Sequence, residues 1–150
     1  MPSRSPRPLS VKVIILYLVI GSVMPNLFID PTYWSPIFGV RVEGWPAIAH
    51  ELIFSVTLPL IVAVGLWRLS DLARRWAIGL SAYWMLNSLL MLANPHLRAM
   101  EYAEVYDPDL SRSVNIAIDV SVTVLIFAIE FLVIWFLIKR KPAFSTRRGG

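Results

Sequence analysis

The chain has 150 residues, of which 57% are hydrophobic and only 16% are charged, and its mean hydropathy is +0.63. Soluble domains usually carry about 25% charged residues, and a domain of this size cannot bury so large an apolar fraction. The composition therefore excludes a soluble globular domain, a disordered chain and a nucleic-acid-binding module, and it indicates an integral membrane protein. The lack of cysteine excludes disulfides, thiolate metal sites, thiol redox chemistry and a covalently attached c-type haem.

Four apolar segments approach the length of roughly 17–25 residues that a membrane-spanning helix needs. In chain order they cover about 13–29, 46–67, 76–93 and 114–138. The first is the shortest, and Pro25 and Asn26 interrupt its end. Because lipid cannot hydrogen-bond a peptide group, each segment must satisfy its backbone internally, which favours helices. We therefore predict an all-α fold, an integral membrane bundle of four transmembrane helices over 13–138, with basic cytoplasmic tails at 1–12 and 139–150.

The basic residues favour one side of this bundle. Most of the 14 lie in the two tails and the second connection, at Arg4, Arg7, Lys12, Arg68, Arg74, Arg75, Lys139, Arg140, Lys141, Arg147 and Arg148. Cytoplasmic loops of membrane proteins carry an excess of Lys and Arg. We therefore expect both termini in the cytoplasm, which agrees with an even number of spans, and a multi-pass protein of the cell membrane, in particular the bacterial inner membrane.

The start of the chain allows one alternative. A basic stretch followed by a short apolar run also describes a secretory signal peptide. The region Gly21-Ser22-Val23-Met24 before Pro25 lacks a clear small-x-small cleavage pattern, so we favour a retained first helix. Cleavage would leave three spans with the N-terminus outside, and the later charge pattern would still fit.

Two connections are expected on the outer side. The first, 26–45, is rich in Trp, Tyr, Phe and Pro, and we expect it to lie against the membrane interface as an aromatic loop. The other, 94–113, is polar and acidic, and it suggests a short amphipathic helix around 98–106 that stops at Asp107-Pro108.

Ionisable residues inside the apolar segments are the most informative chemical signal. A carboxylate at membrane depth is costly and usually faces the bundle interior or a water-filled cavity. Glu51, Asp119 and Glu130 are such residues, and Glu130 lies near the middle of the fourth segment. Asp119 and Glu130 are separated by close to three helical turns, so they share one helix face, about 16 Å apart along the axis.

We predict that these residues belong to an intramembrane polar track. Its members are Glu130, Asp119, Asn115, Asn87, Glu51 and His50. Such a track could carry protons or small cations, or bind a polar headgroup. The structural alternative is that a protonated Glu130 hydrogen-bonds a neighbouring helix or a partner subunit, while Asn87 and Ser88 join helices together. Both interpretations stay open at the level of the sequence.

The sequence offers no catalytic constellation. His50-Glu51 is not followed by the second histidine of an H-E-x-x-H motif, because Phe54 stands there, and G-x-S-x-G, Walker and G-x-G-x-x-G motifs are absent. His50 and His96 could ligate haem or a metal only from buried, facing positions, and His96 follows Asn94-Pro95 near a predicted helix end. We therefore predict no catalytic residue, no cofactor and no metal.

Two stretches of the sequence resemble parts of known membrane proteins. One is Arg7-Pro8-Leu9-Ser10-Val11, before the first apolar segment, and the other is Gly65-Leu66-Trp67-Arg68-Leu69 with Ala73-Arg74-Arg75-Trp76-Ala77, at the second turn. They are similar to the start and the basic, tryptophan-flanked turn of small uncharacterised bacterial four-helix integral membrane proteins. The resemblance covers a small part of the chain and is mainly topogenic. It implies a four-helix bundle in a bacterial inner membrane, and it transfers no catalytic residue.

These observations favour a non-enzymatic integral membrane protein. We expect an accessory, assembly or structural subunit that packs in the lipid bilayer against a membrane-protein partner or as a homo-oligomer, with no nucleic-acid partner. The alternative is a small oligomeric transporter or proton-coupled carrier that uses the intramembrane carboxylates. A membrane enzyme or a quinone or haem redox protein is the least supported class.

Overall fold

The computed structural model describes residues 8–23, 34–94, 96–97 and 112–145. These residues are mostly helical, with one small β-hairpin. The elements are α1 (Leu9–Tyr17), η1 (Leu18–Val23), β1 (Trp34–Ile37), β2 (Val40–Glu43), α2 (Trp45–Glu51), η3 (Leu52–Thr57), α3 (Leu58–Trp67), α4 (Asp71–Ala93), α6 (Arg112–Lys139) and α7 (Lys141–Ser145). The stretches η1 and η3 are wider π-helical turns that continue α1 and join α2 to α3.

Three helices are long and apolar enough to cross a membrane: Trp45–Trp67, Asp71–Ala93 and Ile116–Lys139. They match the second, third and fourth predicted segments, although α4 begins before the predicted residue 76. The apolar helix at the start, Leu9–Gly21, is shorter than a full span. The end of the first predicted segment lies outside the described residues, so the structure supports the four-helix prediction only in part.

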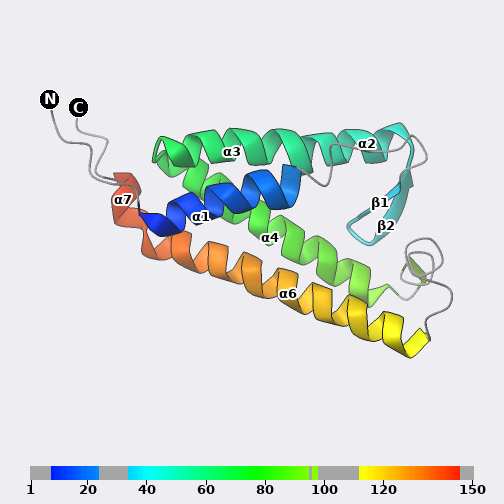
Figure 1. Cartoon of the computed structure of the whole chain (residues 1–150). Coiled ribbons are helices and arrows are strands. Elements are labelled where there is room, and N and C mark those ends of the chain that lie inside the picture. The colour runs from blue at the N-terminus through cyan, green and yellow to red at the C-terminus, as the bar shows by residue number, and fades with distance from the viewer. Residues whose placement is uncertain (1–7, 24–33, 95, 98–111, 146–150) are drawn as a thin grey trace, which may run out of the picture.

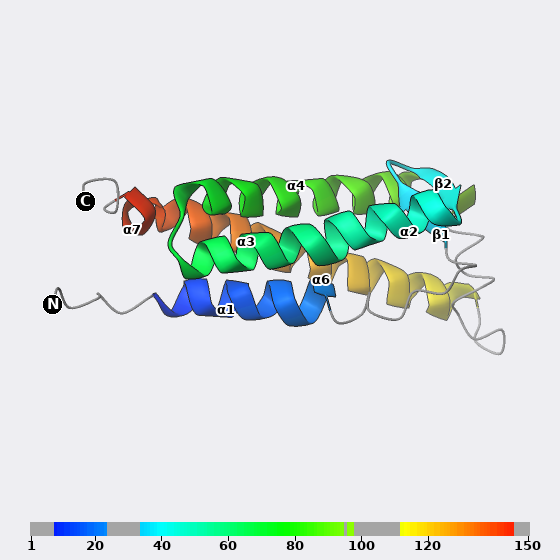
Figure 2. The same ribbon diagram turned by 90° about the horizontal axis from the view of Figure 1, so that it is seen from above.

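The four helical segments run side by side along one long axis (Figures 1 and 2). The start of α1, the α3–α4 connection and α7 lie at one end of the bundle, and the hairpin lies at the other. A continuous apolar core occupies the half nearest α7, and its buried residues are Val11, Ile14, Leu18, Val62, Ala63, Leu66, Ala73, Ala77, Leu80, Val133, Leu137 and Phe144. The half nearest the hairpin is built around polar contacts instead.

The C-terminal part differs from the predicted tail over 139–150. Helix α6 continues through Lys139, and α7 turns back against α4 and α6. The side chain of Phe144 on α7 is only 3% exposed and joins the apolar core. The first residues of this basic segment are therefore part of the fold, because one aromatic side chain anchors them.

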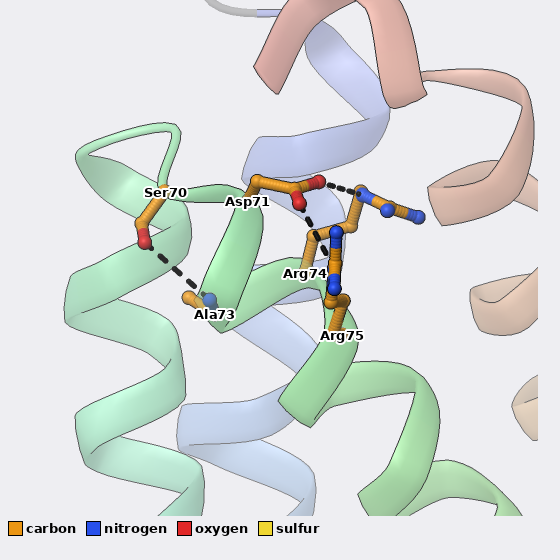
Figure 3. A network of polar contacts seen from close by, with 5 residues as sticks. All are labelled: Ser70, Asp71, Ala73, Arg74 and Arg75. Atoms are coloured by element: carbon orange, nitrogen blue, oxygen red, sulfur yellow. Dashed lines mark hydrogen bonds and ion pairs between the residues drawn. The ribbon is translucent and has the colours of Figure 1, made fainter. Parts of the chain in front are cut away.

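A small polar network starts α4 (Figure 3). The Ser70 hydroxyl caps the helix by accepting from the Ala73 amide at 3.4 Å. The Asp71 carboxylate accepts from Nε of Arg74 at 2.8 Å and from Nε of Arg75 at 2.9 Å. A side-chain acceptor and an acid in the first turn both stabilise a helix N-terminus. This cap explains why α4 begins before the apolar run that hydropathy detects.

The β-hairpin lies within the predicted aromatic loop, and sequence analysis did not predict it. Strands β1 and β2 pair antiparallel, with Trp34 opposite Glu43 and Ile37 opposite Val40. The two turn residues, Phe38 and Gly39, have φ values of 49° and 75°. Two positive φ values at the centre suit the tight turn of a two-residue hairpin. The other predicted outer feature, the helix around 98–106, lies outside the described residues.

Helices α3 and α4 are in close contact at Gly65. A Cβ atom on Gly65 would overlap the Cβ of Ala73, whereas a Cβ atom on Gly79 would meet nothing within 4 Å. Overpacking a close contact costs about 1–3 kcal/mol, while alanine favours a helix over glycine by about 1 kcal/mol. We expect Gly65→Ala to lower the unfolding temperature in detergent, and the matched Gly79→Ala variant to leave it unchanged or raise it. Tryptophan fluorescence during heating measures both, and equal behaviour would contradict the close packing.

Candidate functional site

A cavity of about 410 Å³ lies between the helices next to the hairpin. Residues of α1, η1, β1, α2, η3, α4 and α6 line it, so it is assembled from nearly the whole described fold. Its polar lining residues are Tyr17, Ser35, Glu51, Ser55, Asn87, Ser88 and Glu130. Trp84, Met91, Ile126 and Ile129 are among the larger side chains that complete the wall. We call this space the carboxyl cavity.

Glu130 is one of the two carboxyl groups that line the carboxyl cavity. It projects from α6 and is only 4% exposed. The hydroxyl of Tyr17 on α1 donates to its Oε1 at 2.5 Å, and Ser81 on α4 is a second hydrogen-bonding neighbour. Glu130 therefore connects three helices, because each of its hydroxyl partners comes from a different one.

Glu51 is the second carboxyl group in the lining of the cavity. It ends α2 and is 5% exposed. Oγ of Ser35 on β1 donates to its Oε1 at 3.0 Å, and Oγ of Ser55, one turn further along the same helix, donates to its Oε2. Glu51 thus joins the hairpin to the helix that follows it.

Asn87 holds the hairpin against α4. It is 5% exposed, its Oδ1 accepts from the Phe38 amide at 2.7 Å, and its Nδ2 donates to the Pro36 carbonyl at 2.7 Å. Asn94, at the end of α4, donates from Nδ2 to the Gly39 carbonyl at 3.0 Å. Both polar atoms of the Asn87 side chain are therefore used by hairpin backbone, which supports the structural interpretation for this residue.

His50 does not line the carboxyl cavity. Its Nε2 is hydrogen-bonded to the Tyr83 hydroxyl on α4, and its ring stacks on Phe54 with centroids 4.9 Å apart. Trp84 and Tyr83 meet edge-on beside it, with centroids 5.2 Å apart. His50 belongs to an aromatic cluster between η3 and α4, next to the cavity wall.

The predicted polar track is therefore assembled only in part. Glu51, Asn87 and Glu130 line one cavity, as the track requires. Asn115 and Asp119 lie on α6, and their side chains fall outside what the structure describes. His96 is exposed, and no group of three His, Cys, Asp or Glu side chains among the described residues could hold a metal ion.

Sequence reasoning missed the hydroxyl partners of the two acids. Ser55 could have been found, because it lies four residues after Glu51 and such pairs are neighbours on a helix. Tyr17 and Ser35 could not, since only tertiary structure brings them beside Glu130 and Glu51. A tyrosine in an apolar helix otherwise suggests an interface anchor.

The lining determines which ligands the carboxyl cavity can accept. It contains two carboxyl groups and, among the described residues, no lysine, arginine or histidine. Burying an anionic group without a partner is strongly unfavourable. The cavity is therefore suited to carboxyl groups that are protonated, or to a cation that enters and neutralises them.

No model of a known protein family, no characterised protein and no solved structure matches this chain. The resemblance to small bacterial four-helix membrane proteins therefore remains a prediction.

We expect Asn87→Ala to loosen the hairpin without unfolding the bundle. The substitution removes the partners of the Phe38 amide and the Pro36 carbonyl, and each unsatisfied buried group costs about 1–3 kcal/mol. Hydrogen exchange followed by mass spectrometry should show faster exchange over 34–44 and unchanged exchange in α3. Ser88→Ala, beside it on the same cavity wall, is the matched control. Equal exchange in the two variants would show that Asn87 does not hold the hairpin.

Proposed function

We propose that this chain is a small integral membrane carrier that binds a small cation, the proton being the simplest case, at Glu51 and Glu130. The observation that supports this proposal is the carboxyl cavity, with two buried acids from different helices and no basic residue in its described lining. Intramembrane acids that face a cavity are typical of ion and proton pathways.

The proposal places four helical segments across the bacterial inner membrane, with both chain ends in the cytoplasm. Three helices have spanning length, and the start of α1, the α3–α4 turn and α7 lie at one end of the bundle. The nine residues of α1 and six of η1 rise about 22 Å, whereas the hydrocarbon core is about 30 Å thick. These two described segments are therefore shorter than a full crossing.

The hydroxyl partners of the two acids suit a site that changes its protonation state. A hydroxyl group donates to an ionised carboxylate and accepts from a protonated one. Tyr17 beside Glu130, and Ser35 and Ser55 beside Glu51, can therefore serve both states by rotating their O–H bonds. Exchange of a proton for a cation at either acid would keep the buried charge near zero, which lowers the cost of the step.

The hairpin would control access from the outer side. Ser35 and Pro36 of β1 line the carboxyl cavity, and Ser35 donates to Glu51. A cation at Glu51 would compete for the same oxygen and weaken the attachment of β1. Movement of the hairpin would then open the cavity to the outer side, while Asn87 sets how easily it moves.

A second candidate is the accessory or structural subunit, and α6 favours it. No described side chain of α6 before Glu130 is buried. Its exposed large apolar residues there are Val114, Ile118, Val120, Val122, Val124, Leu125 and Ile126. A helix of a partner membrane protein, or of a second copy of the chain, could pack on this uncovered half.

The proposed orientation can be measured with single cysteines, because the sequence contains none of its own. Val40 lies in the hairpin and is 62% exposed, whereas the side chain of Arg75, at the other end of the bundle, is 66% exposed. We expect a membrane-impermeant maleimide to label Val40→Cys in cells with permeabilised outer membranes, and Arg75→Cys only after the inner membrane is opened. Labelling of Arg75→Cys in place of Val40→Cys would show that the orientation is opposite to the one proposed.

We expect purified protein in liposomes to conduct protons when a potassium diffusion potential is applied, and Glu130→Gln to reduce the flux to that of protein-free vesicles. Glutamine keeps the shape and a hydrogen-bond acceptor but cannot bind or release the proton. A pH-sensitive dye inside the vesicles reports the flux. Glu51→Gln should act in the same direction.

The matched control is Glu43→Gln, because the Glu43 carboxyl on β2 is 65% exposed and lies outside the carboxyl cavity. It should conduct as the unmodified protein does. Flux that persists in both cavity variants would contradict the carrier. If, in addition, a second membrane protein co-purified in fixed stoichiometry, the subunit function would be favoured.

A further inference from the structure

A second, apolar space lies between α1 and α6, on the side of Tyr17 away from Ser35 and Asn87. It has a volume of about 510 Å³ and is lined on α1 by Leu9, Ser10, Val13, Ile14 and Tyr17. Its other wall is formed by α6 from Ile129 to Phe136. Apart from Ser10 and Tyr17, every lining residue is apolar. We call this space the α1–α6 groove.

The length of the groove fits one leaflet of a bilayer. The α1 wall, from Leu9 to Tyr17, rises about 12 Å along the helix, while half of the hydrocarbon core is about 15 Å. At its deep end lies Tyr17, whose hydroxyl donates to Glu130 on α6 and so joins the two helices there. The groove itself is confined to about one leaflet, a length that suits a lipid acyl chain.

Basic side chains lie in the first turns of α1 and at the end of α6, at the end of the bundle where the groove begins. Lys139 and Arg140 follow Phe136 by about one turn of α6, and Lys12 lies in the first turns of α1. All three are exposed. Nζ of Lys139 lies 4.4 Å from the ring centroid of Trp135, a pairing typical of the membrane interface. The groove therefore ends where a negatively charged headgroup would be attracted.

Ser10 adds a polar atom at the depth of a lipid glycerol. Its hydroxyl oxygen is buried and has no hydrogen-bond partner among the described residues. Buried polar groups are normally paired, so an unpaired one calls for an explanation. Ser10 lies within one turn of the open end, where an ester oxygen of a bound lipid would be in reach.

We propose that an anionic phospholipid of the cytoplasmic leaflet binds to this chain, with one acyl chain in the α1–α6 groove and its phosphate among Lys12, Lys139 and Arg140. The inference uses the membrane orientation proposed above and is independent of cation transport. The lipid fills the space between α1 and α6 beneath Tyr17, and so supports the short first helix against its neighbour.

The test is a titration of the full-length protein in detergent with phosphatidylglycerol and with phosphatidylcholine of the same acyl chains, followed by native mass spectrometry. We expect one saturable phosphatidylglycerol site that phosphatidylcholine occupies more weakly. Each basic residue near a membrane surface contributes about 1 kcal/mol of attraction to anionic lipid. Lys139→Gln with Arg140→Gln should therefore weaken phosphatidylglycerol binding about 30-fold, which corresponds to about 2 kcal/mol.

Two further variants separate the groove from general basicity. Val13→Trp would fill the groove and should abolish binding of both lipids, whereas Val64→Trp, on an exposed position of α3, should not. Arg75→Gln removes an exposed charge at the same end of the bundle but away from the groove, and should leave binding unchanged. Equal affinity for the two lipids, or unaltered binding in the double variant, would overturn the proposal. Thermal unfolding of each variant shows whether it is folded.

Discussion

The hydrogen bond from Tyr17 to Glu130 is the contact on which the arrangement of this bundle depends. Helices in lipid gain little from apolar burial against one another, because the acyl chains are equally apolar, so packing and polar contacts must hold them. This bond joins the short first helix, α1, to α6, the longest helix that the structure describes. It also lies between the carboxyl cavity and the α1–α6 groove, since Tyr17 lines both.

The two halves of the bundle on either side of this bond are held together by different kinds of contact. Toward α7, small and branched apolar residues pack tightly, and Gly65 allows α3 and α4 to approach closely. Toward the hairpin, the described α6 side chains are not buried, and polar side chains satisfy one another around a cavity. An apolar half suits stability, while a hollow polar half suits the binding and movement that a carrier requires.

The side chains that hold the hairpin also connect it to the proposed function. Asn87 and Glu51 both hydrogen-bond the hairpin, yet they differ in what a ligand can change. Asn87 carries no charge and binds backbone atoms, so its contacts are independent of protonation. Glu51 binds a serine hydroxyl that a cation or proton can affect. In the proposed carrier, the contacts of Asn87 would limit movement of the hairpin, and the contact of Glu51 would respond to the ligand.

Hydropathy along the sequence determined the helical class and three helices that are long and apolar enough to cross a membrane, because apolar runs are local and have a defined helical length. The same reasoning singled out Glu51 and Glu130, since a carboxyl group in an apolar run requires a polar environment wherever it lies. Sequence did not predict the hairpin, because its turn includes Phe38 in a left-handed conformation that phenylalanine rarely adopts. The partners of the acids were likewise decided only by tertiary structure. A tyrosine or serine can bond to water, backbone or another side chain, and only the packing of α1, β1 and α6 determines which of these it meets.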